Sequence, residues 1–344
     1  MTHTSAELSI PDHFDPVRVG EVWRVPYQQR SLAAQDWANQ HQLQPAAQDT
    51  RRICLLAIDV QNTFCIPEFE LFVAGQSGMG AVADTVRLCE FVYRNLGKIT
   101  TIVPTLDTHT ATQVFHPIFW VNAAGEHPIP MTMISLDEVR QGKWRVNPSI
   151  AATLAIAPEQ VEGFALHYVN RLSQDGKYPL TIWPYHSMLG GIGHALVSAF
   201  EEACFFHTIA RQCQTRFEIK GNNPLTENYS VLRPEVLVDG SGQAIAEKNF
   251  ALIQLLLAYD AVIVAGQAKS HCVAWTVDDL LAEIQPIDPA LVQKVYLLED
   301  CTSPVVVPGV IDFTEQAETA YQRFAAAGMH IVRSTEAIDR WLKL

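Results

Sequence analysis

The chain is poor in basic residues and has no long apolar run. Among its 344 residues, 24 are Lys or Arg and 37 are Asp or Glu, which gives a formal net charge of -13. Nucleic acids and anionic membranes bind clustered Lys and Arg side chains, so this balance argues against both as partners and favours a small neutral or cationic ligand. No apolar run reaches the ~18 to 20 residues of a membrane span, and the first residues lack the basic start and apolar stretch of a signal peptide. We therefore expect a cytoplasmic protein that binds neither nucleic acid nor a membrane.

The chain also lacks any pattern in its cysteines. The seven cysteines include no Cys-x-x-Cys pair and stand at unevenly spaced positions (54, 65, 89, 204, 213, 272 and 301). Such a set disfavours both a disulfide framework and a thiolate zinc site, and it leaves the role of a nucleophile open for one of them. With 48% hydrophobic and 18% charged residues and no internal repeat, the composition is that of a globular protein with a substantial core.

From residue 53 onward, short apolar runs alternate with segments of helical periodicity. The runs expected to form strands are Ile53 to Val60, Ile99 to Thr105, Arg216 to Lys220, Ala261 to Ala265, Val295 to Glu299 and His330 to Arg333. Helices are expected over residues 82–96, 194–212, 245–257, 272–284, 313–327 and 336–342. Near-continuous apolar strands are buried on both faces. The alternation therefore predicts an α/β fold of three αβα layers around a mainly parallel six-stranded sheet, with the ligand site at the carboxyl ends of the strands.

Two stretches do not follow this alternation. Residues 1–50 are rich in Gln and Ala, and we interpret them as an N-terminal extension, either an arm across a subunit interface of a homo-oligomer or a disordered tail. Residues 117–182, which contain six of the prolines, are interpreted as a long insertion into a domain of residues 51–344. A connection of that length is usually a lid, a binding loop or a small subdomain.

One carboxylate and three imidazoles gather in two short segments. Asp107, His109 and His116 follow the second predicted strand within ten residues, and His186 lies in Trp183-Pro-Tyr-His186. This donor set suits zinc, iron(II) or manganese better than calcium or magnesium, which prefer oxygen ligands. The chain has twelve His residues, so ordinary loop and surface histidines are the alternative interpretation.

Three further residues stand at strand ends. Asp59 closes the first predicted strand and Lys220 closes the third, while Cys272 is placed at the start of a helix. A thiol at a helix N-terminus experiences the positive end of the helix dipole, which lowers its pKa and favours the nucleophilic thiolate. Taken singly, each has an ordinary explanation: a strand-end turn, a solvated lysine and a small buried hydrophobe.

Together these segments resemble the nicotinamidase and isochorismatase-like cysteine hydrolases. The resemblance spans most of residues 53–310 and rests on Asp59-Val-Gln-Asn-Thr-Phe-Cys65, Lys220-Gly, and Gln267-Ala-Lys-Ser-His-Cys-Val273, which match the segments of that family's Asp, Lys and Cys triad. Leu106-Asp-Thr-His109 and Trp183-Pro-Tyr-His186 are similar to the metal-binding motifs of the nicotinamidase branch. The chain departs from the family's motifs at Thr63, Leu106, Thr108 and Ser187, and it is much longer than a typical member.

The resemblance implies a metal-containing amidase that hydrolyses nicotinamide to nicotinic acid and ammonia through a Cys thioester. It implies that Asp59, Lys220 and Cys272 are catalytic and that one divalent ion, zinc, iron or manganese, is held by Asp107, His109 and His186, with His116 at a variable fourth position. The backbone N–H groups of Ala268 and Cys272 would form the oxyanion hole, next to a cis peptide between Gln267 and Ala268. Phe64, Trp183 and Gln267 are the residues expected to bind the substrate.

Two alternatives remain open from the sequence. The first keeps the cysteine chemistry but changes the substrate to another carboxamide or an N-carbamoyl compound, because the insertions in this chain alter the surroundings of the site. The second is a non-catalytic ligand-binding protein on the same scaffold. His271, next to the expected nucleophile, is interpreted as a structural residue because Asp59 already fills the role of base.

Overall fold

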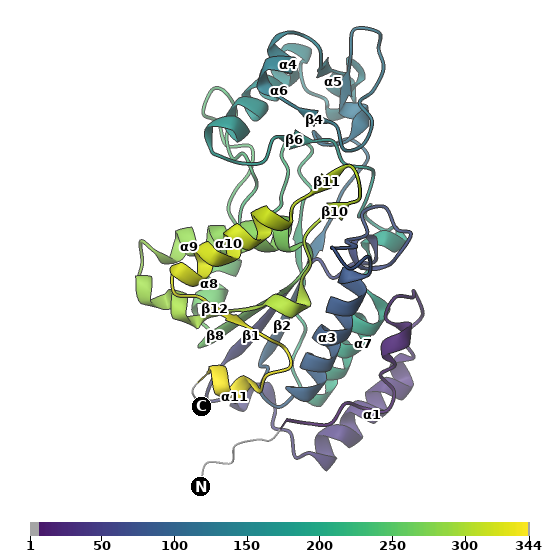
Figure 1. Ribbon diagram of the computed structural model, residues 1–344, viewed down its shortest axis with the longest axis vertical. Coiled ribbons are helices and arrows are strands. Elements are labelled where there is room, and N and C mark those ends of the chain that lie inside the picture. The colour runs from purple at the N-terminus through teal and green to yellow at the C-terminus, as the bar shows by residue number, and fades with distance from the viewer. Residues whose placement is uncertain (1–6, 343–344) are drawn as a thin grey trace.

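The computed structural model describes residues 7–342 and has three layers with a parallel sheet in the middle (Figure 1). The sheet has the strand order β12-β9-β8-β1-β2-β7, and every neighbouring pair is parallel. Its strands are β1 (Ile53–Ile58), β2 (Thr101–Asp107), β7 (Glu218–Lys220), β8 (Ala261–Gly266), β9 (Val295–Leu298) and β12 (His330–Val332). The predicted fold class is therefore confirmed.

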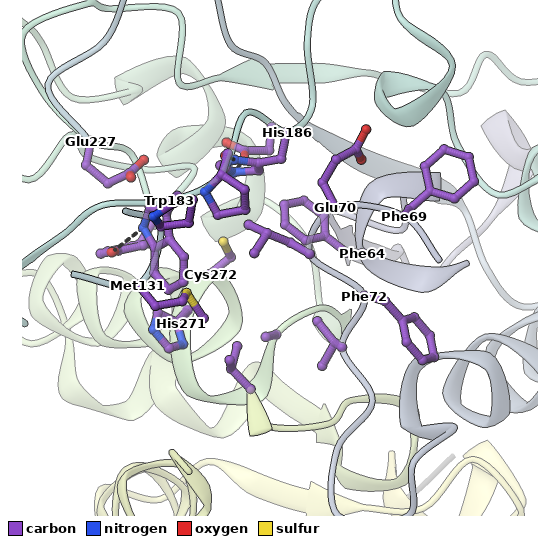
Figure 2. A pocket seen from close by; sticks show the side chains of 18 of the residues that line it. Phe64, Phe69, Glu70, Phe72, Met131, Trp183, His186, Glu227, His271 and Cys272 are labelled. Atoms are coloured by element: carbon purple, nitrogen blue, oxygen red, sulfur yellow. Dashed lines mark hydrogen bonds and ion pairs between the residues drawn. The ribbon is translucent and has the colours of Figure 1, made fainter. Parts of the chain in front are cut away.

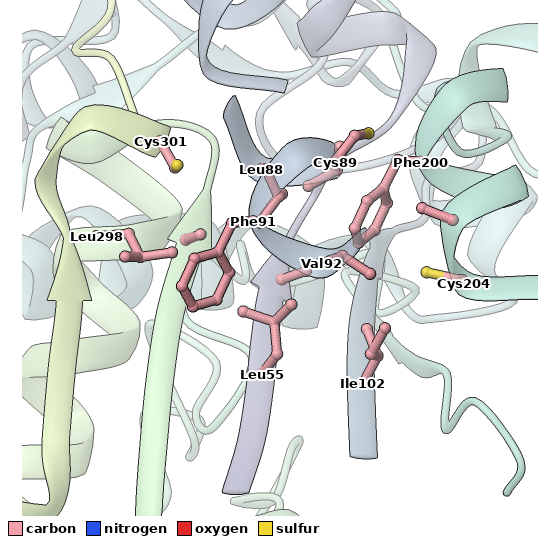
Figure 3. Packing of buried hydrophobic residues seen from close by; sticks show 14 of the residues in the cluster. Leu55, Leu88, Cys89, Phe91, Val92, Ile102, Phe200, Cys204, Leu298 and Cys301 are labelled. Carbon is pink, nitrogen blue, oxygen red and sulfur yellow. The ribbon is translucent and has the colours of Figure 1, made fainter. Parts of the chain in front are cut away.

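Alternating residues of the central strand β1 point into two separate cores, as the period of two in a strand requires. Ile53, Leu55 and Ala57 belong to a core shared with α3 (Gly80–Arg94), α7 (Ser198–Ala210) and α11 (Ile338–Trp341). Figure 3 shows Leu88, Phe91 and Val92 of α3 between Leu55 of β1 and Phe200 of α7. Cys54, Leu56 and Ile58 face the opposite core, which is covered by α8 (Phe250–Leu257), α9 (Ala274–Ile284) and α10 (Thr314–Ala326). Burial on both faces explains why β1 is apolar throughout.

The N-terminal segment folds back on the chain. Its helix α1 (Tyr27–Gln40) lies along α7, as Figure 1 shows at the lower right. Arg30 Nε lies 2.6 Å from a carboxylate oxygen of Glu202, and the Trp23 N–H donates to Ser198 Oγ at 2.9 Å. Within residues 7–50, the contacts therefore join this segment to the outer face of α7.

The inserted residues form a small subdomain above the carboxyl ends of the strands (Figure 1). Phe119, Trp120, Phe164 and Tyr168 are buried in a core of their own, next to Trp183. The elements are β3 (Trp120–Val121), β4 (Met133–Ile134), α4 (Leu136–Arg140), β5 (Arg145–Val146), α5 (Ser149–Leu154), α6 (Pro158–Gln174) and β6 (Leu180–Thr181). A second addition is the hairpin of β10 (Val306–Val307) and β11 (Ile311–Asp312). Both additions border the carboxyl edge of the sheet, where the predicted site lies.

Several predicted boundaries were wrong by a few residues. The helix expected from residue 245 begins at Phe250, because the Asn249 side chain accepts the Leu252 N–H at 3.0 Å and caps it there. Asp107 is the last residue of β2 and does not follow the strand. Cys272 does not open a helix but lies inside a five-residue π-helical turn, Lys269–Val273, that precedes α9. Within residues 7–342, the structure has no helix with the length and apolar character needed to cross a bilayer.

Candidate active site

Asp59, Lys220 and Cys272 meet at the carboxyl edge of the sheet. Asp59 directly follows β1, Lys220 ends β7, and Cys272 lies in the turn that follows β8. Lys220 Nζ lies 2.9 Å from Asp59 Oδ2 and 3.6 Å from Cys272 Sγ. The structure therefore brings the three predicted catalytic residues into one group, although they are separated by more than 50 residues in each interval of the sequence.

Lys220 is the centre of this group and also connects it to Asp107. Its ammonium lies 2.9 Å from Asp107 Oδ1 and donates to the Asn228 carbonyl oxygen at 2.8 Å. Burial favours loss of the charge, but Asp107, Asp59 and Cys272 together raise the pKa of Lys220 well above its ordinary value. Lys220 is therefore a fixed positive charge between two carboxylates and a thiol.

Thr105 orients Asp59 from the neighbouring strand β2. Its hydroxyl accepts the Asp59 N–H at 3.0 Å and donates to Asp59 Oδ1. Burial raises the pKa of Asp59, while Lys220 and the Thr105 hydrogen bond oppose the rise. Burial has the same effect on Asp107, but His109 and Lys220 outweigh it and bring the pKa of Asp107 well below its ordinary value. The pKa values of the two carboxyl groups are thus shifted in opposite directions, that of Asp59 upward and that of Asp107 downward.

The expected lowering of the Cys272 pKa is wrong. The residue lies in the π-helical turn and is 8% exposed, and burial raises the pKa of its thiol well above the ordinary value, with Lys220 opposing and Asp59 adding to the rise. The reason is that desolvation of the thiolate outweighs both the positive charge nearby and the helix that begins only at Ala274. The surroundings of Cys272 therefore favour the thiol over the thiolate.

The turn that carries Cys272 begins with a cis peptide between Gln267 and Ala268, as the resemblance implied. Ala268 borders the same cavity as Cys272. Gln267 does not border it: its side-chain amide donates to Asp84 at 2.9 Å and its amide oxygen accepts the Ser303 N–H at 3.2 Å. The structure therefore gives Gln267 a role in holding the turn and does not bring it to the cavity.

Asp107, His109 and His186 form one buried group of three metal-ligand side chains. One ligand atom from each lies within 4.8 Å of the others, and Asp107 Oδ2 is 2.7 Å from His109 Nε2 and 3.4 Å from His186 Nε2. His116 is outside this group, but its ring centroid is 5.9 Å from that of His109 and 6.1 Å from that of His186. Three of the four predicted ligands therefore converge, and the fourth lies beside them.

The three imidazoles share one hydrogen-bonding arrangement. The Nδ1 atoms of His109, His116 and His186 lie 3.1, 3.2 and 2.8 Å from backbone carbonyl oxygens of Gly221, Ala111 and Pro184. A carbonyl only accepts, so each Nδ1 carries the hydrogen and each Nε2 has its lone pair free for a metal or a proton. Without a cation, Asp107 raises the pKa of His109 despite its burial, and His116 Nε2 has no partner among the described residues. These residues therefore fit a divalent ion with nitrogen and carboxylate ligands.

A cavity of about 460 Å³ opens beside Cys272 and the metal-ligand group. Figure 2 shows Phe64, Trp183, His186 and Cys272 around it. Phe64 and Trp183 were predicted to bind a substrate ring, and both border the cavity. Asp59 lies deeper, with no exposed surface, so Cys272 and Lys220 separate it from the cavity.

Three residues of the site were not predicted. Thr105 was counted only as part of an apolar strand, and Asn228 contributes a backbone carbonyl, for which a sequence carries no signal. Glu227 borders the cavity, and burial raises its pKa to about 7, with the positive charge of His109 opposing the rise. The only available signal was an isolated Glu in a polar loop after Lys220.

His271 lies next to Cys272 and borders the cavity. It is buried among the rings of Tyr178, Trp183, Tyr229 and Phe313, and its Nδ1 lies 2.9 Å from Ser270 Oγ. Burial lowers the pKa of His271 to about 3. An imidazole with so low a pKa is a poor proton acceptor.

A scan against models of protein families and a search of curated proteins each give no match. Among solved structures, the nicotinamidase and pyrazinamidase of Acinetobacter baumannii is similar at 19% identity and a TM-score of 0.48, covering 84% of this chain and 99% of its own. The yeast nicotinamidase Pnc1p has 16% identity and a TM-score of 0.48, with 81% and 99% covered. The pyrazinamidase of Pyrococcus horikoshii in complex with zinc has 16% identity and a TM-score of 0.44, with 82% and 99% covered.

Proposed function

We propose that this chain is an amidase that hydrolyses a planar carboxamide through a thioester on Cys272. The observation that carries the proposal is the arrangement of a buried thiol, a buried carboxylate and an ammonium that contacts both, in the wall of a cavity with a metal-ligand group. A nucleophile, a base and a group that orients the base are the elements of nucleophilic catalysis.

In the proposed reaction, Asp59 takes the proton of the Cys272 thiol as the sulfur attacks the carboxamide carbon. The N–H groups of Ala268 and Cys272 stabilise the oxyanion of the tetrahedral intermediate. Asp59 then gives its proton to the amide nitrogen, the C–N bond of the tetrahedral intermediate breaks, and ammonia leaves while the acyl group remains on Cys272 as the thioester. Next, Asp59 takes a proton from water, the hydroxide attacks the thioester carbon, and the acid and the Cys272 thiol are released. Lys220 keeps Asp59 ionised at the start of each half-reaction.

One divalent ion, zinc, iron or manganese, would be held by Asp107, His109 and His186, with His116 in reach of it as a further ligand. When bound, the ion supplies a Lewis-acidic position for a heteroatom of the substrate, such as a pyridine nitrogen. Phe64 and Trp183 border the cavity with aromatic faces on which a planar ring can pack. Nicotinamide, with a ring nitrogen and a carboxamide, is therefore the first substrate to test, and the reaction would yield nicotinic acid and ammonia.

The test is ammonia release from nicotinamide and a panel of other carboxamides and N-carbamoyl compounds. We expect Cys272→Ala to abolish the release, whereas the buried Cys301→Ala, which removes a thiol next to Asp300 and Ser334, should retain it. Equal ammonia release by the Cys272→Ala variant and the native protein would refute the assignment of Cys272 as the nucleophile. Absence of release from every amide, with metal bound, would favour a non-catalytic ligand-binding protein instead.

A further inference from the structure

The cavity is larger than a one-ring amide requires. At about 30 Å³ for each water molecule in the liquid, a cavity of about 460 Å³ has room for at least about 15 waters. This volume is in the range of pockets that enclose drug-sized ligands. A ring packed between Phe64 and Trp183 beside Cys272 would therefore leave part of the cavity to be filled by something else.

The lining of the cavity changes character with distance from Cys272. At one end lie the polar groups of the site, among them Asp107, His186, Lys220 and Glu227. The other end is an apolar arm, which we define as the part bordered by Phe69, Leu71, Phe72, Val305 and Val307, with the exposed Glu70 between Phe69 and Leu71. In Figure 2, Phe69 and Phe72 lie on the opposite side of Phe64 from Glu227 and His271. The arm thus continues from the site of the proposed reaction.

The apolar arm is built from two segments that are far apart in the sequence. Residues 69–73 follow the short helix α2 (Asn62–Cys65), and Val305 and Val307 belong to the β10–β11 hairpin. All five of its side chains are half-buried. The hairpin is fixed to the turn of the nucleophile, because the Val305 N–H donates to Ser270 Oγ at 3.0 Å. Covering this apolar surface with an apolar ligand removes it from water, which favours binding of the ligand beside Cys272.

The position of Asp59 decides which side of the amide faces the arm. Asp59 must reach the leaving nitrogen, and it has no exposed surface, enclosed by Thr105 and Lys220. The nitrogen of the substrate must therefore point towards Cys272 and Lys220, behind which Asp59 lies, and away from the apolar arm. The group that fills the apolar arm must be attached on the acyl side.

The charges around the cavity exclude an anionic group. Its carboxylates are Asp107, Glu70 and Glu227, and the ammonium of Lys220 is already shared between Asp59 and Asp107. An anionic group on the substrate would have no cation of its own in the arm, and its desolvation would weaken binding.

Resting on the proposed function, we propose that the substrate is a primary carboxamide whose acyl side bears an uncharged apolar substituent, and that this substituent lies in the apolar arm. Val307 is a specificity-determining residue for it. The hairpin offers a matched control, since Val305 and Val307 face the cavity while Val306, which pairs with Asp312, does not border it.

The experiment measures kcat/KM for ammonia release from benzamides that carry alkyl chains of increasing length, with one chain ending in a carboxylate. We expect kcat/KM to rise about fourfold for each methylene until the arm is full, and the carboxylate-terminated compound to lose this gain. In Val307→Phe, the preference for long over short amides should fall about tenfold or more. In Val306→Phe, the preference should be that of the native protein.

Three results would overturn the inference. A flat series, or the same preference in Val307→Phe and Val306→Phe, would refute the arm as a substrate site while Cys272-dependent hydrolysis leaves the proposed function standing. A change of molecular mass by light scattering in Val307→Phe, with an unchanged amide preference, would assign the arm to a second copy of the chain. No Cys272-dependent release from any amide in the series would refute both proposals.

Discussion

Lys177 and Glu235 form a buried ion pair that joins the insertion to the loop after β7. Lys177 Nζ lies 3.2 Å from Glu235 Oε2, and the two side chains are 8% and 1% exposed. The ammonium also lies 3.8 Å from the ring centroid of Trp275 on α9. Glu235 Oε1 has no hydrogen-bond partner among the described residues, so Lys177 is the main compensation for this buried carboxylate. Replacing Lys177 by Met would leave the Glu235 charge uncompensated.

The expected loss depends on pH. Burial raises the pKa of Glu235 from its ordinary value to about 7, with Lys177 opposing the rise. Between the pKa of the unfolded chain and about pH 7, the folded protein keeps a proton that the unfolded chain releases, so stability falls as pH rises through this window. Without Lys177, the pKa of Glu235 rises further, and the fall becomes larger and extends to higher pH. At about pH 8.5, Lys177→Met should cost about 3 to 5 kcal/mol of unfolding free energy. At about pH 5.5, with Glu235 protonated, the variant loses only the contact of the ammonium with Trp275 and its contact with an uncharged carboxyl group, about 1 to 2 kcal/mol.

The assay is urea unfolding followed by tryptophan fluorescence at both pH values, for the native protein, Lys177→Met and Lys143→Met. Lys143 is the matched control, because it pairs with Glu138 in the same insertion but is 60% exposed. An exposed pair contributes at most about 1 kcal/mol, so Lys143→Met should change little at either pH. The reasoning would be refuted by a Lys177→Met loss that is the same at both pH values, or by equal losses in the two variants.

Three further predictions concern the site. Thr105→Val removes the hydrogen bond that lowers the pKa of Asp59, so the acid limb of the kcat/KM profile for amide hydrolysis should move to higher pH; an unmoved limb would show that Thr105 does not act on the base. Lys220→Met leaves Asp59 and Asp107 buried without their shared cation, so the free energy of unfolding in denaturant titrations should fall by about 3 to 5 kcal/mol, and amide hydrolysis should be lost. A stable and active Lys220→Met variant would contradict the role of Lys220. Dialysis against a chelator should lower the melting temperature, and zinc, iron(II) or manganese should restore it. Metal analysis should find less metal in His186→Ala than in His116→Ala. Equal metal content in the two variants would show that His116 contributes to metal binding as much as His186 does.

The strands β1, β2, β8 and β9 could be predicted because they are buried on both faces over most of their length and therefore read as apolar runs. The candidate site could be predicted in part because parallel strands end at one edge, which brings residues such as Asp59 and Lys220 together regardless of their separation in sequence. The groups that hydrogen-bond to Asp59 and Lys220 could not be predicted in this way. Thr105 faces Asp59 only because β1 and β2 are neighbours in register, and the Asn228 carbonyl belongs to a loop whose path no periodicity encodes.

The wrong expectation for Cys272 has a definite physical origin. Its sequence position predicted a helix start, and a thiol at a helix start has a lowered pKa. The structure moves the start of α9 by two residues, to Ala274, and places the thiol in a buried π-helical turn. This small displacement leaves the thiol buried and away from the helix start, and burial raises its pKa where a lowered pKa was expected.

No helix or strand was predicted within the insertion, although Val161, Phe164, Tyr168 and Leu172 recur at helical spacing and form the buried face of α6. The insertion reaches the site, since Tyr178 donates to the Ser270 carbonyl at 2.9 Å and Met131 borders the cavity. Met131 has a φ of 71°, a left-handed conformation that is unfavourable for a side chain of this kind, and such strain is kept where the surrounding contacts require it. The positions of Asp59, Lys220 and Cys272 are thus determined by the edge of the sheet. The shape of the cavity above them depends on the insertion, the β10–β11 hairpin and residues 69–73. Two chains with the same triad and metal ligands but different insertions should therefore share the chemistry of Cys272 and differ in the amide that they accept.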